Sequence, residues 1–153
     1  MIRFNNDYNH GAHASILEAL EEINETSYAG YGEDEWCQRG ADEIRKYLGN
    51  VDGARLGYWL SCDECDVTLE DLTNIADVFY IGGTKCGALF GEALVIVNKK
   101  LRDHFRTYMK QSGGILAKGW LLGLQFYTLF KNGLYFELTK HADELAMKLK
   151  QGF

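Results

Sequence analysis

Residues 79–98 read FYIGGTKCGALFGEALVIVN, two runs of β-forming apolar residues on either side of a glycine turn. This pattern predicts two strands, at residues 77–81 and 88–97, with a bend at Gly91. Lys85 follows the Gly-Gly-Thr turn directly. Because the flanking runs look buried, this position is costly for a charge unless the amine is paired or neutralised. The stretch therefore raises the question of what Lys85 does.

The rest of the chain reads as helices that would pack around these strands, because apolar residues recur at helical spacing. Thr68 and Asp71 resemble a capping box before a short helix, and Asn98 can cap a later one. The helix around residues 115–131 is apolar almost all round, which predicts that it is buried. The predicted class is α/β, with few strands flanked by helices. The longer predicted helices are residues 13–25, 35–48, 99–110, 115–131 and 134–150.

Length and composition describe one ordinary globular domain. The chain has 153 residues, of which 46% are hydrophobic and 25% are charged, as in average globular proteins. Its net charge of −6 disfavours a nucleic-acid or anionic membrane partner. The N-terminus has no apolar signal core, and the longest apolar stretches are shorter than a membrane span. We therefore expect a cytoplasmic protein. Proline is absent, which indicates that loops that normally carry it are missing or altered.

The cysteines give no metal site. Cys62 and Cys65 form a C-x-x-C pair, which could be redox-active or half of a zinc site. A zinc site needs a second pair of cysteine or histidine ligands, and no comparable pair follows. Reduced thiols are the simpler interpretation for a cytosolic protein.

Lys85 has a structural and a functional interpretation. It could be a side chain that snorkels to water at a strand edge, or an amine able to form a Schiff base. Thr84 offers a hydroxyl beside the amine, and the preceding Gly-Gly pair would let a ligand approach the backbone. The stretch DGAR supplies Asp52 and Arg55. An aspartate can hold a cofactor's pyridine nitrogen protonated, and an arginine can clamp a substrate carboxylate.

Three blocks of sequence resemble the pyridoxal-phosphate-dependent threonine aldolase and β-eliminating lyase family, which has the aspartate-aminotransferase fold type. The first block is RFNNDYNHGAH together with AGYGEDEWCQ near the N-terminus. The second is DGARLGY, residues 52–58. The third is ADVFYIGGTKCGALFGEALVIVN, which continues into ILAKGWLLGLQF. The third block is long and specific, so the three together make a chance similarity improbable.

The resemblance implies a role for each candidate residue. Lys85 would form the Schiff base with pyridoxal 5'-phosphate, and Asp52 would partner its pyridine nitrogen. Arg55 would bind the substrate carboxylate, and Thr84 would lie near the phosphate end. Tyr31 would reach toward the active site of a neighbouring subunit, so we expect a homo-oligomer, either a dimer or a tetramer. The implied reaction cleaves a β-hydroxy amino acid such as threonine or allo-threonine into glycine and an aldehyde. β-Elimination on another amino acid is an alternative.

The chain also departs from the family pattern. Asp52 follows a helix end and Gly49, and the three residues from Gly49 leave no room for the buried strand that precedes this aspartate in the family. The resemblance thus implies that a segment on the order of a hundred residues is absent, with the phosphate cup and a ring-stacking histidine. The histidines present are expected to be surface or capping residues. They are His10, His13, His104 and His141.

The resemblance further implies that residues 1–153 form one shortened large domain, with residues 134–153 beginning the helix toward a missing small domain. The apolar helix around residues 115–131 favours self-association, unless it forms the core of the monomer. Two classes of function follow from these features. One is a shortened lyase that keeps Lys85, Asp52 and Arg55, and the other is a non-catalytic remnant that has lost the cofactor.

Overall fold

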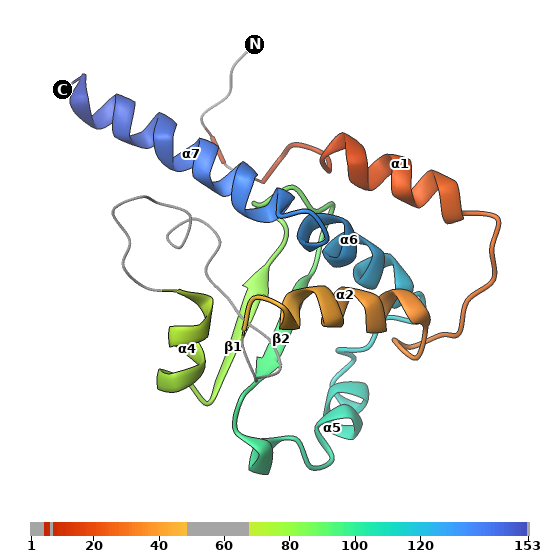
Figure 1. The fold of residues 1–153 in the computed structure, drawn as a ribbon. Helices are drawn as coiled ribbons and strands as arrows, with labels where there is room; N and C mark the ends of the chain where they lie inside the picture. Colours follow the sequence, from red (N-terminus) through yellow and green to blue (C-terminus); the bar gives the residue numbers. More distant parts are fainter. Residues whose placement is uncertain (1–4, 7, 49–67, 153) are drawn as a thin grey trace.

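The protein's computed structural model describes residues 5–6, 8–48 and 68–152. These residues form a two-stranded antiparallel sheet with helices packed around it (Figure 1). The α/β class with few strands flanked by helices is therefore confirmed. The elements in chain order are α1 (Ala14–Ile23), α2 (Glu35–Arg45), α4 (Leu69–Ile75), β1 (Val78–Gly82), β2 (Glu92–Ile96), the 3₁₀ helix η1 (Lys99–Leu101), α5 (Phe105–Gln111), α6 (Trp120–Phe130) and α7 (Leu134–Gln151).

The two strands form a hairpin with one buried and one open face. Ile81 on β1 and Val95 on β2 are each 1% exposed and belong to the hydrophobic core. Tyr80 and Leu94, which lie opposite each other in the register, are on the exposed face. This alternation follows from the two-residue period of a strand. The predicted strands are confirmed, although the second begins only after Gly91, whose φ of +96° bends the chain.

Helix α6 is the centre of the molecule. Most of its residues are buried, and Leu129 and Phe130 are completely inaccessible. Phe130 stacks on Tyr135 of α7 with a ring-centroid distance of 4.7 Å. The prediction that this helix is buried is confirmed, and the described part of a single chain buries it. Its apolar surface alone therefore does not require a second copy.

Helices α2 and α6 approach each other so closely that only glycine fits at their contact. A Cβ atom at Gly123 would lie 2.2 Å from the backbone nitrogen of Cys37, and one at Gly40 would lie 2.6 Å from the carbonyl oxygen of Gly123. Both glycines are buried. The contact fixes α2 on α6 and so positions the loop that precedes α2, residues 31–34, which we call the YGED loop (Figure 1).

Two helices begin at side-chain caps, and the cap at Thr68 confirms a prediction from the sequence. Asp34 precedes α2, and its Oδ1 accepts a hydrogen bond of 2.8 Å from the backbone N–H of Cys37. Thr68 and Asp71 form a complete capping box at the start of α4. Hydrogen bonds from the Thr68 hydroxyl and backbone N–H hold the pKa of Asp71 below its usual range. Short-range signals of this kind are readable from sequence because they involve residues only three positions apart.

Two predicted helices differ from the observed ones. The helix expected at 99–110 is divided into η1, which Asn98 caps, and α5. His104 stands between them with a φ of +56°, a left-handed conformation that no α-helix can contain. The helix expected at 115–131 begins only at Trp120. The residues before it pack against the YGED loop instead, where the carbonyl of Ala117 accepts a hydrogen bond of 2.9 Å from Tyr31 N–H.

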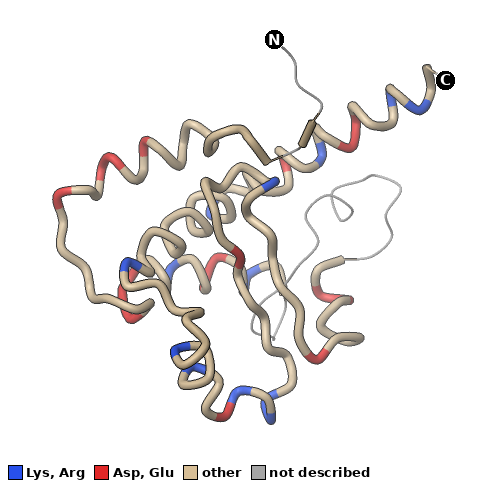
Figure 2. Tube along the Cα trace, turned by 180° about the vertical axis from the view of Figure 1, so that it is seen from behind, with Lys and Arg blue, Asp and Glu red and all other residues tan. Residues whose placement is uncertain are grey.

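Charge is unevenly distributed over the fold (Figure 2). Helix α1 contains three glutamates and no lysine or arginine. By contrast, η1, α5 and the residues between them contain five lysines and arginines and one aspartate. None of the helices that the structure describes is long and apolar enough to span a bilayer.

Candidate active site

Lys85 lies in a tight loop between β1 and β2. The carbonyl oxygen of Gly83 accepts hydrogen bonds from the backbone N–H groups of Cys86, at 2.9 Å, and Ala88, at 3.0 Å. The N–H of Gly83 donates to the carbonyl of Gly91 at 3.1 Å. Three backbone hydrogen bonds thus converge on Gly83, and the loop that they close presents Lys85 to solvent.

Only glycine fits at Gly83. A Cβ atom there would lie 2.8 Å from the Cβ of Ala88 and 2.9 Å from the carbonyl oxygen of Gly91. Gly83 and Cys86 are buried, as the sequence pattern predicted for the neighbours of Lys85, but Thr84 and Lys85 are exposed. The expected cost of burying the lysine charge therefore does not arise, because water reaches the side chain.

The N-terminal segment is joined to this loop through His13. The backbone N–H of His13 donates to the carbonyl oxygen of Gly87 at 2.8 Å. The Nδ1 atom of His13 accepts a hydrogen bond of 3.3 Å from the N–H of Ser15 and so caps α1. The neutral ring therefore carries its proton on Nε2, because an accepting nitrogen cannot also be the protonated one. The prediction that His13 is a capping residue is confirmed.

A cavity of about 350 Å³ lies where these segments meet. It is lined by Tyr8 and residues 10–13 of the N-terminal segment, by residues 84–87, and by Leu138 and Thr139 of α7. The lining contains an amine, two imidazoles and several hydroxyl groups. Among the residues that the structure describes, the lining has no carboxylate side chain. The cavity therefore offers a primary amine together with hydrogen-bond donors suited to an anionic ligand.

The structure brings together some of the predicted site residues. Lys85 and Thr84 line one cavity, and Tyr31 lies elsewhere, on the loop before α2. Asp52 and Arg55 lie outside the described residues, as does the C-x-x-C pair. His10 and Tyr8 line the cavity, whereas the sequence indicated only a surface or capping role for His10 and no role for Tyr8. Both residues belong to the N-terminal block that resembles the family, RFNNDYNHGAH. That block could have been assigned to the lysine site from the sequence.

Tyr31 is held in a strained conformation. Its φ is +60°, which is uncommon for a bulky residue. The carbonyl of Tyr31 accepts a hydrogen bond of 2.7 Å from Nη2 of Arg106, and the Nζ of Lys110 lies 4.9 Å from the centre of its ring. Arg106 also pairs with Glu33 at 2.9 Å. Backbone strain that surrounding contacts maintain is typical of functional loops.

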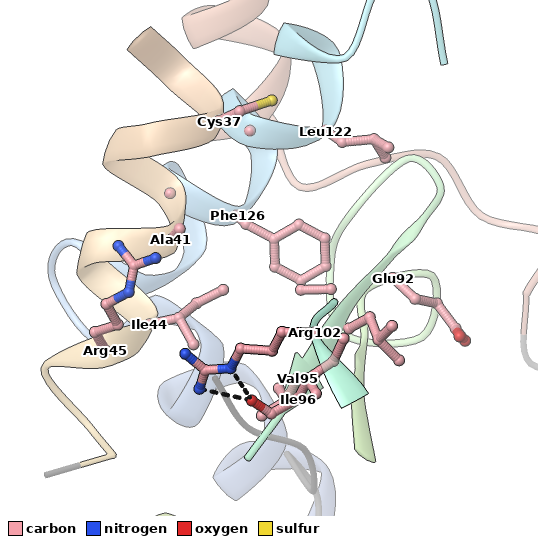
Figure 3. Close-up of a pocket in the computed structure, with 14 residues that line it drawn as sticks. Cys37, Ala41, Ile44, Arg45, Glu92, Val95, Ile96, Arg102, Leu122 and Phe126 are labelled. Carbon is pink, nitrogen blue, oxygen red and sulfur yellow. Dashed lines mark hydrogen bonds between the residues drawn. The ribbon is translucent and has the colours of Figure 1, made fainter. Parts of the chain in front are cut away.

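A second cavity, of about 400 Å³, lies between α2, β2 and α6 (Figure 3). Its walls are mainly apolar and include Ile44, Val95 and Phe126. The Arg102 side chain enters from one end and donates two hydrogen bonds, from Nε at 3.1 Å and Nη2 at 2.8 Å, to the carbonyl of Ile96. Lys85 is not part of this lining. The second cavity therefore contains no amine for Schiff-base chemistry.

Cys37 lines the second cavity but is not suited to act as a nucleophile. Burial raises the pKa of its thiol to about 12, and the hydrogen bond to Asp34 and the negative charge of that residue add to the effect. The reactive form of a cysteine is the thiolate, which is scarce at neutral pH when the pKa is this high. Within the described residues, no cluster of three or more histidine, cysteine, aspartate or glutamate side chains is placed to hold a metal ion.

Comparisons with known proteins identify relatives of the chain. A low specificity L-threonine aldolase of a Pseudomonas species is 33% identical over 102 residues, which is 65% of this chain and 29% of that protein. The low specificity L-threonine aldolase of Pseudomonas aeruginosa is 27% identical over 105 residues, covering 67% of this chain and 30% of its own length. The chain thus matches about three tenths of the length of these curated relatives. No family model matches it.

A solved structure of Leishmania major threonine aldolase superposes with a TM-score of 0.89 and 26% sequence identity. The match covers 96% of this chain and 77% of that one. The fold is therefore a shortened large domain of fold type I, the fold of a major class of pyridoxal-phosphate-dependent enzymes. Sequence and structural similarity point to the same group within that class. In both sequence and fold, the chain is similar to threonine aldolases.

The residues around Lys85 fit part of the cofactor that the resemblance implies. Pyridoxal 5'-phosphate combines an aldehyde, which reacts with an amine, and a phosphate, which needs hydrogen-bond donors or positive charge. Lys85 supplies the amine, and Thr84 and the two histidines of the lining supply donors. The loop has glycine where a side chain would collide with the backbone, at Gly83. The described donor set thus suits an anionic aldehyde.

Proposed function

We propose that this chain carries the lysine-bearing part of a pyridoxal-phosphate-dependent lyase site of the threonine aldolase type. In this proposal it cleaves β-hydroxy amino acids such as threonine or allo-threonine into glycine and an aldehyde. The observation that supports it best is the cavity shared by Lys85, Thr84 and the N-terminal segment. The first and third resembling blocks meet there, although they are far apart in the sequence.

Each residue has a distinct task in this proposal. When bound, pyridoxal 5'-phosphate supplies the aldehyde and a protonated ring that accepts electrons from the breaking Cα–Cβ bond. Lys85 would hold the cofactor covalently until a substrate amine replaces it, and the amine freed in this way would be able to exchange a proton with the substrate. Thr84 donates its hydroxyl toward the phosphate end. Asp52 keeps the ring nitrogen protonated and Arg55 clamps the substrate carboxylate. These last two roles rest on the resemblance alone.

We also propose that the working form is a homo-oligomer. Lys85 is exposed in the single chain, and a Schiff base formed at an exposed amine is open to hydrolysis by water. Tyr31 is exposed on a loop that Arg106 and Lys110 hold in place. A second copy that placed its Tyr31 loop over the cavity would exclude water and complete the site.

A non-catalytic remnant is the second candidate function. The chain matches only 29% and 30% of the lengths of the two curated relatives, and phosphate contacts supply much of the anchoring in cofactor sites of this kind. A remnant would keep the fold and the oligomer interface without holding the cofactor. A β-eliminating lyase acting on another amino acid is the remaining alternative within the enzyme class.

The proposal is tested by two measurements on the same full chain. The first is the yellow absorbance that develops when pyridoxal 5'-phosphate is added, and the second is glycine release from threonine. The lyase predicts both in the wild type and neither in Lys85→Ala. Lys150→Ala, which removes an exposed lysine near the end of α7, is the control and should match the wild type. Absence of both signals from the wild type would favour the remnant, and absorbance without glycine release would favour β-elimination or loss of catalysis.

A further inference from the structure

We propose that the cavity beside Lys85 contains an oxyanion subsite in which His13 and His10 bind a phosphate or carboxylate group. The inference deepens the proposed function, because it concerns the same cavity, and rests on it for the identity of the ligand. Neither the family comparisons nor the roles implied by resemblance assign these histidines to the site. The resemblance places them in the N-terminal block, where only surface or capping roles were expected.

His13 is a hydrogen-bond donor whose orientation is already fixed. Its backbone is tied to Gly87 by a 2.8 Å hydrogen bond, and its Nδ1 is occupied by the N–H of Ser15. The proton of the neutral ring is thus on Nε2, the nitrogen that the cap does not use. A half-buried ring held at two points loses little conformational freedom when a ligand binds. His13 therefore meets the requirements for a preorganised donor.

The charge balance of the cavity favours an anion. His10 and Lys85 line it together with His13, and the described residues of the lining include no aspartate or glutamate. Thr84 adds a hydroxyl on the side of the loop. An oxyanion that enters the cavity meets several donors among the described residues, and charge-assisted hydrogen bonds of this kind are the stronger ones. A cationic ligand would instead be repelled by the charge of Lys85.

The packing around Gly87 explains why the donors lie so near the lysine loop. A Cβ atom at Gly87 would lie 2.8 Å from Cδ1 of Leu138 on α7 and 3.5 Å from Cβ of His13. The loop, the N-terminal segment and α7 are therefore in close contact at this glycine. Lys85 and His13 are separated by only Cys86 and the Gly87–His13 hydrogen bond along this path. A ligand bonded to the lysine amine would lie beside the histidine donors.

The shared chemistry is an oxyanion, and it has two sources in the proposed reaction. The phosphate of the cofactor is one source, and the carboxylate of the amino acid is the other. Binding of the cofactor phosphate by His13 and His10 would supply phosphate donors, which matters because the resemblance implies that the glycine-rich phosphate cup is absent. The two sources predict different behaviour toward simple anions, so they can be separated with inorganic phosphate and acetate as probes.

The test is an NMR titration of the histidine side chains in the full chain at constant pH. Inorganic phosphate and acetate are added in separate experiments to the wild type. We expect the imidazole signals of His13 and His10 to shift with saturation on at least one anion. Those of His104 and His141, which lie outside the cavity lining and are exposed, should stay unchanged. Tighter binding of phosphate assigns the subsite to the cofactor, and tighter binding of acetate assigns it to the substrate.

Variants separate anion binding from helix capping. His13→Asn keeps a side chain that caps helices well but removes the imidazole, and His141→Asn is its matched control on the surface. We expect His13→Asn to weaken anion binding about three- to tenfold, the effect of one lost hydrogen bond, with an unchanged melting temperature. Equal anion affinity in His13→Asn and His141→Asn would overturn the inference. So would a wild type whose four histidine signals shift together or not at all.

The outcome is independent of whether the lyase proposal holds. If anions shift His13 and His10 but the cofactor never reacts with Lys85, the proposed function fails and the oxyanion subsite stands. If the cofactor reacts with Lys85 but its affinity is the same in His13→Asn and the wild type, and neither anion binds, the subsite is wrong and the lysine site stands. The affinity for pyridoxal is measured beside the affinity for pyridoxal 5'-phosphate, because only the second compound carries the phosphate.

Discussion

The backbone N–H of His13 donates a 2.8 Å hydrogen bond to the carbonyl oxygen of Gly87. This bond ties the segment before α1 to the lysine loop between β1 and β2, two parts of the chain that the sequence separates widely. It places Tyr8 and His10 beside Lys85 in one cavity. The lysine site is therefore an assembly of three segments, with α7 as the third, and its integrity depends on how closely they pack.

The first prediction concerns that packing at Gly87. Its φ is +94°, and an added Cβ would come within 2.8 Å of the Leu138 side chain. Gly87→Ala should therefore lose about 1–2 kcal/mol from the left-handed backbone and about 1 kcal/mol from overpacking, the low end of the range because the Leu138 methyl group can move aside. Gly113 has a φ of +71° and nothing within 4 Å, so Gly113→Ala is the matched control and should lose only the backbone part. Urea unfolding of both variants measures the difference, and equal losses would contradict the packing described.

A second prediction concerns the contact between α2 and α6. Gly123→Ala would place a Cβ 2.2 Å from the Cys37 nitrogen, and backbone atoms cannot move aside as a flexible side chain can. We expect the free energy of unfolding to fall by about 3 kcal/mol, the upper part of the range for overpacked cores. Gly152→Ala, where the nearest atom is at 3.4 Å, should change stability little. Thermal and urea unfolding check both, and a stable Gly123→Ala would mean that the helices are farther apart.

The third prediction concerns the reactivity of Cys37. Its pKa of about 12, raised chiefly by burial, leaves almost no thiolate at neutral pH, so alkylation by iodoacetamide should be slow in the native protein. The rate should rise steeply when urea unfolds the chain. Because the pKa is raised in the folded state, unfolding should also become easier as the pH rises from 9.0 toward about 12, where the unfolded thiol ionises first. Mass spectrometry of the Cys37 peptide follows the reaction, and rapid native labelling at neutral pH would refute the prediction.

The sequence predicted those features that depend on residues close together in the chain. The alternation around Ile81 and Val95 defines the strands, and the spacing of Thr68 and Asp71 defines a cap, because both patterns are local. The break at His104 was not predicted, because a histidine carries no strong signal for a left-handed backbone. The late start of α6 was missed for a different reason. It depends on a hydrogen bond between Ala117 and Tyr31, which no local pattern reveals.

Only the local part of the candidate site could be predicted, because its other residues come from distant segments. Lys85 and Thr84 are adjacent to a glycine turn that is visible in the sequence, and the turn exists as expected. The sequence left open whether Lys85 is exposed or buried, because it shows the apolar neighbours but not the direction in which the loop presents its side chains. The contribution of His10 and His13 depends on tertiary contact between distant segments. The roles of Asp52, Arg55 and Tyr31 stay predictions.

Covalent labelling of Lys85 is the most direct test of the central claim. The full chain is incubated with pyridoxal 5'-phosphate and treated with borohydride, and the modified lysine is located by peptide mass spectrometry. The account predicts that the label is on Lys85 at low cofactor concentration, that inorganic phosphate competes with it, and that Lys85→Ala is not labelled elsewhere in its place. A label distributed evenly over exposed lysines such as Lys118 and Lys150, with no preference for Lys85, would contradict the assignment of this loop as the cofactor site.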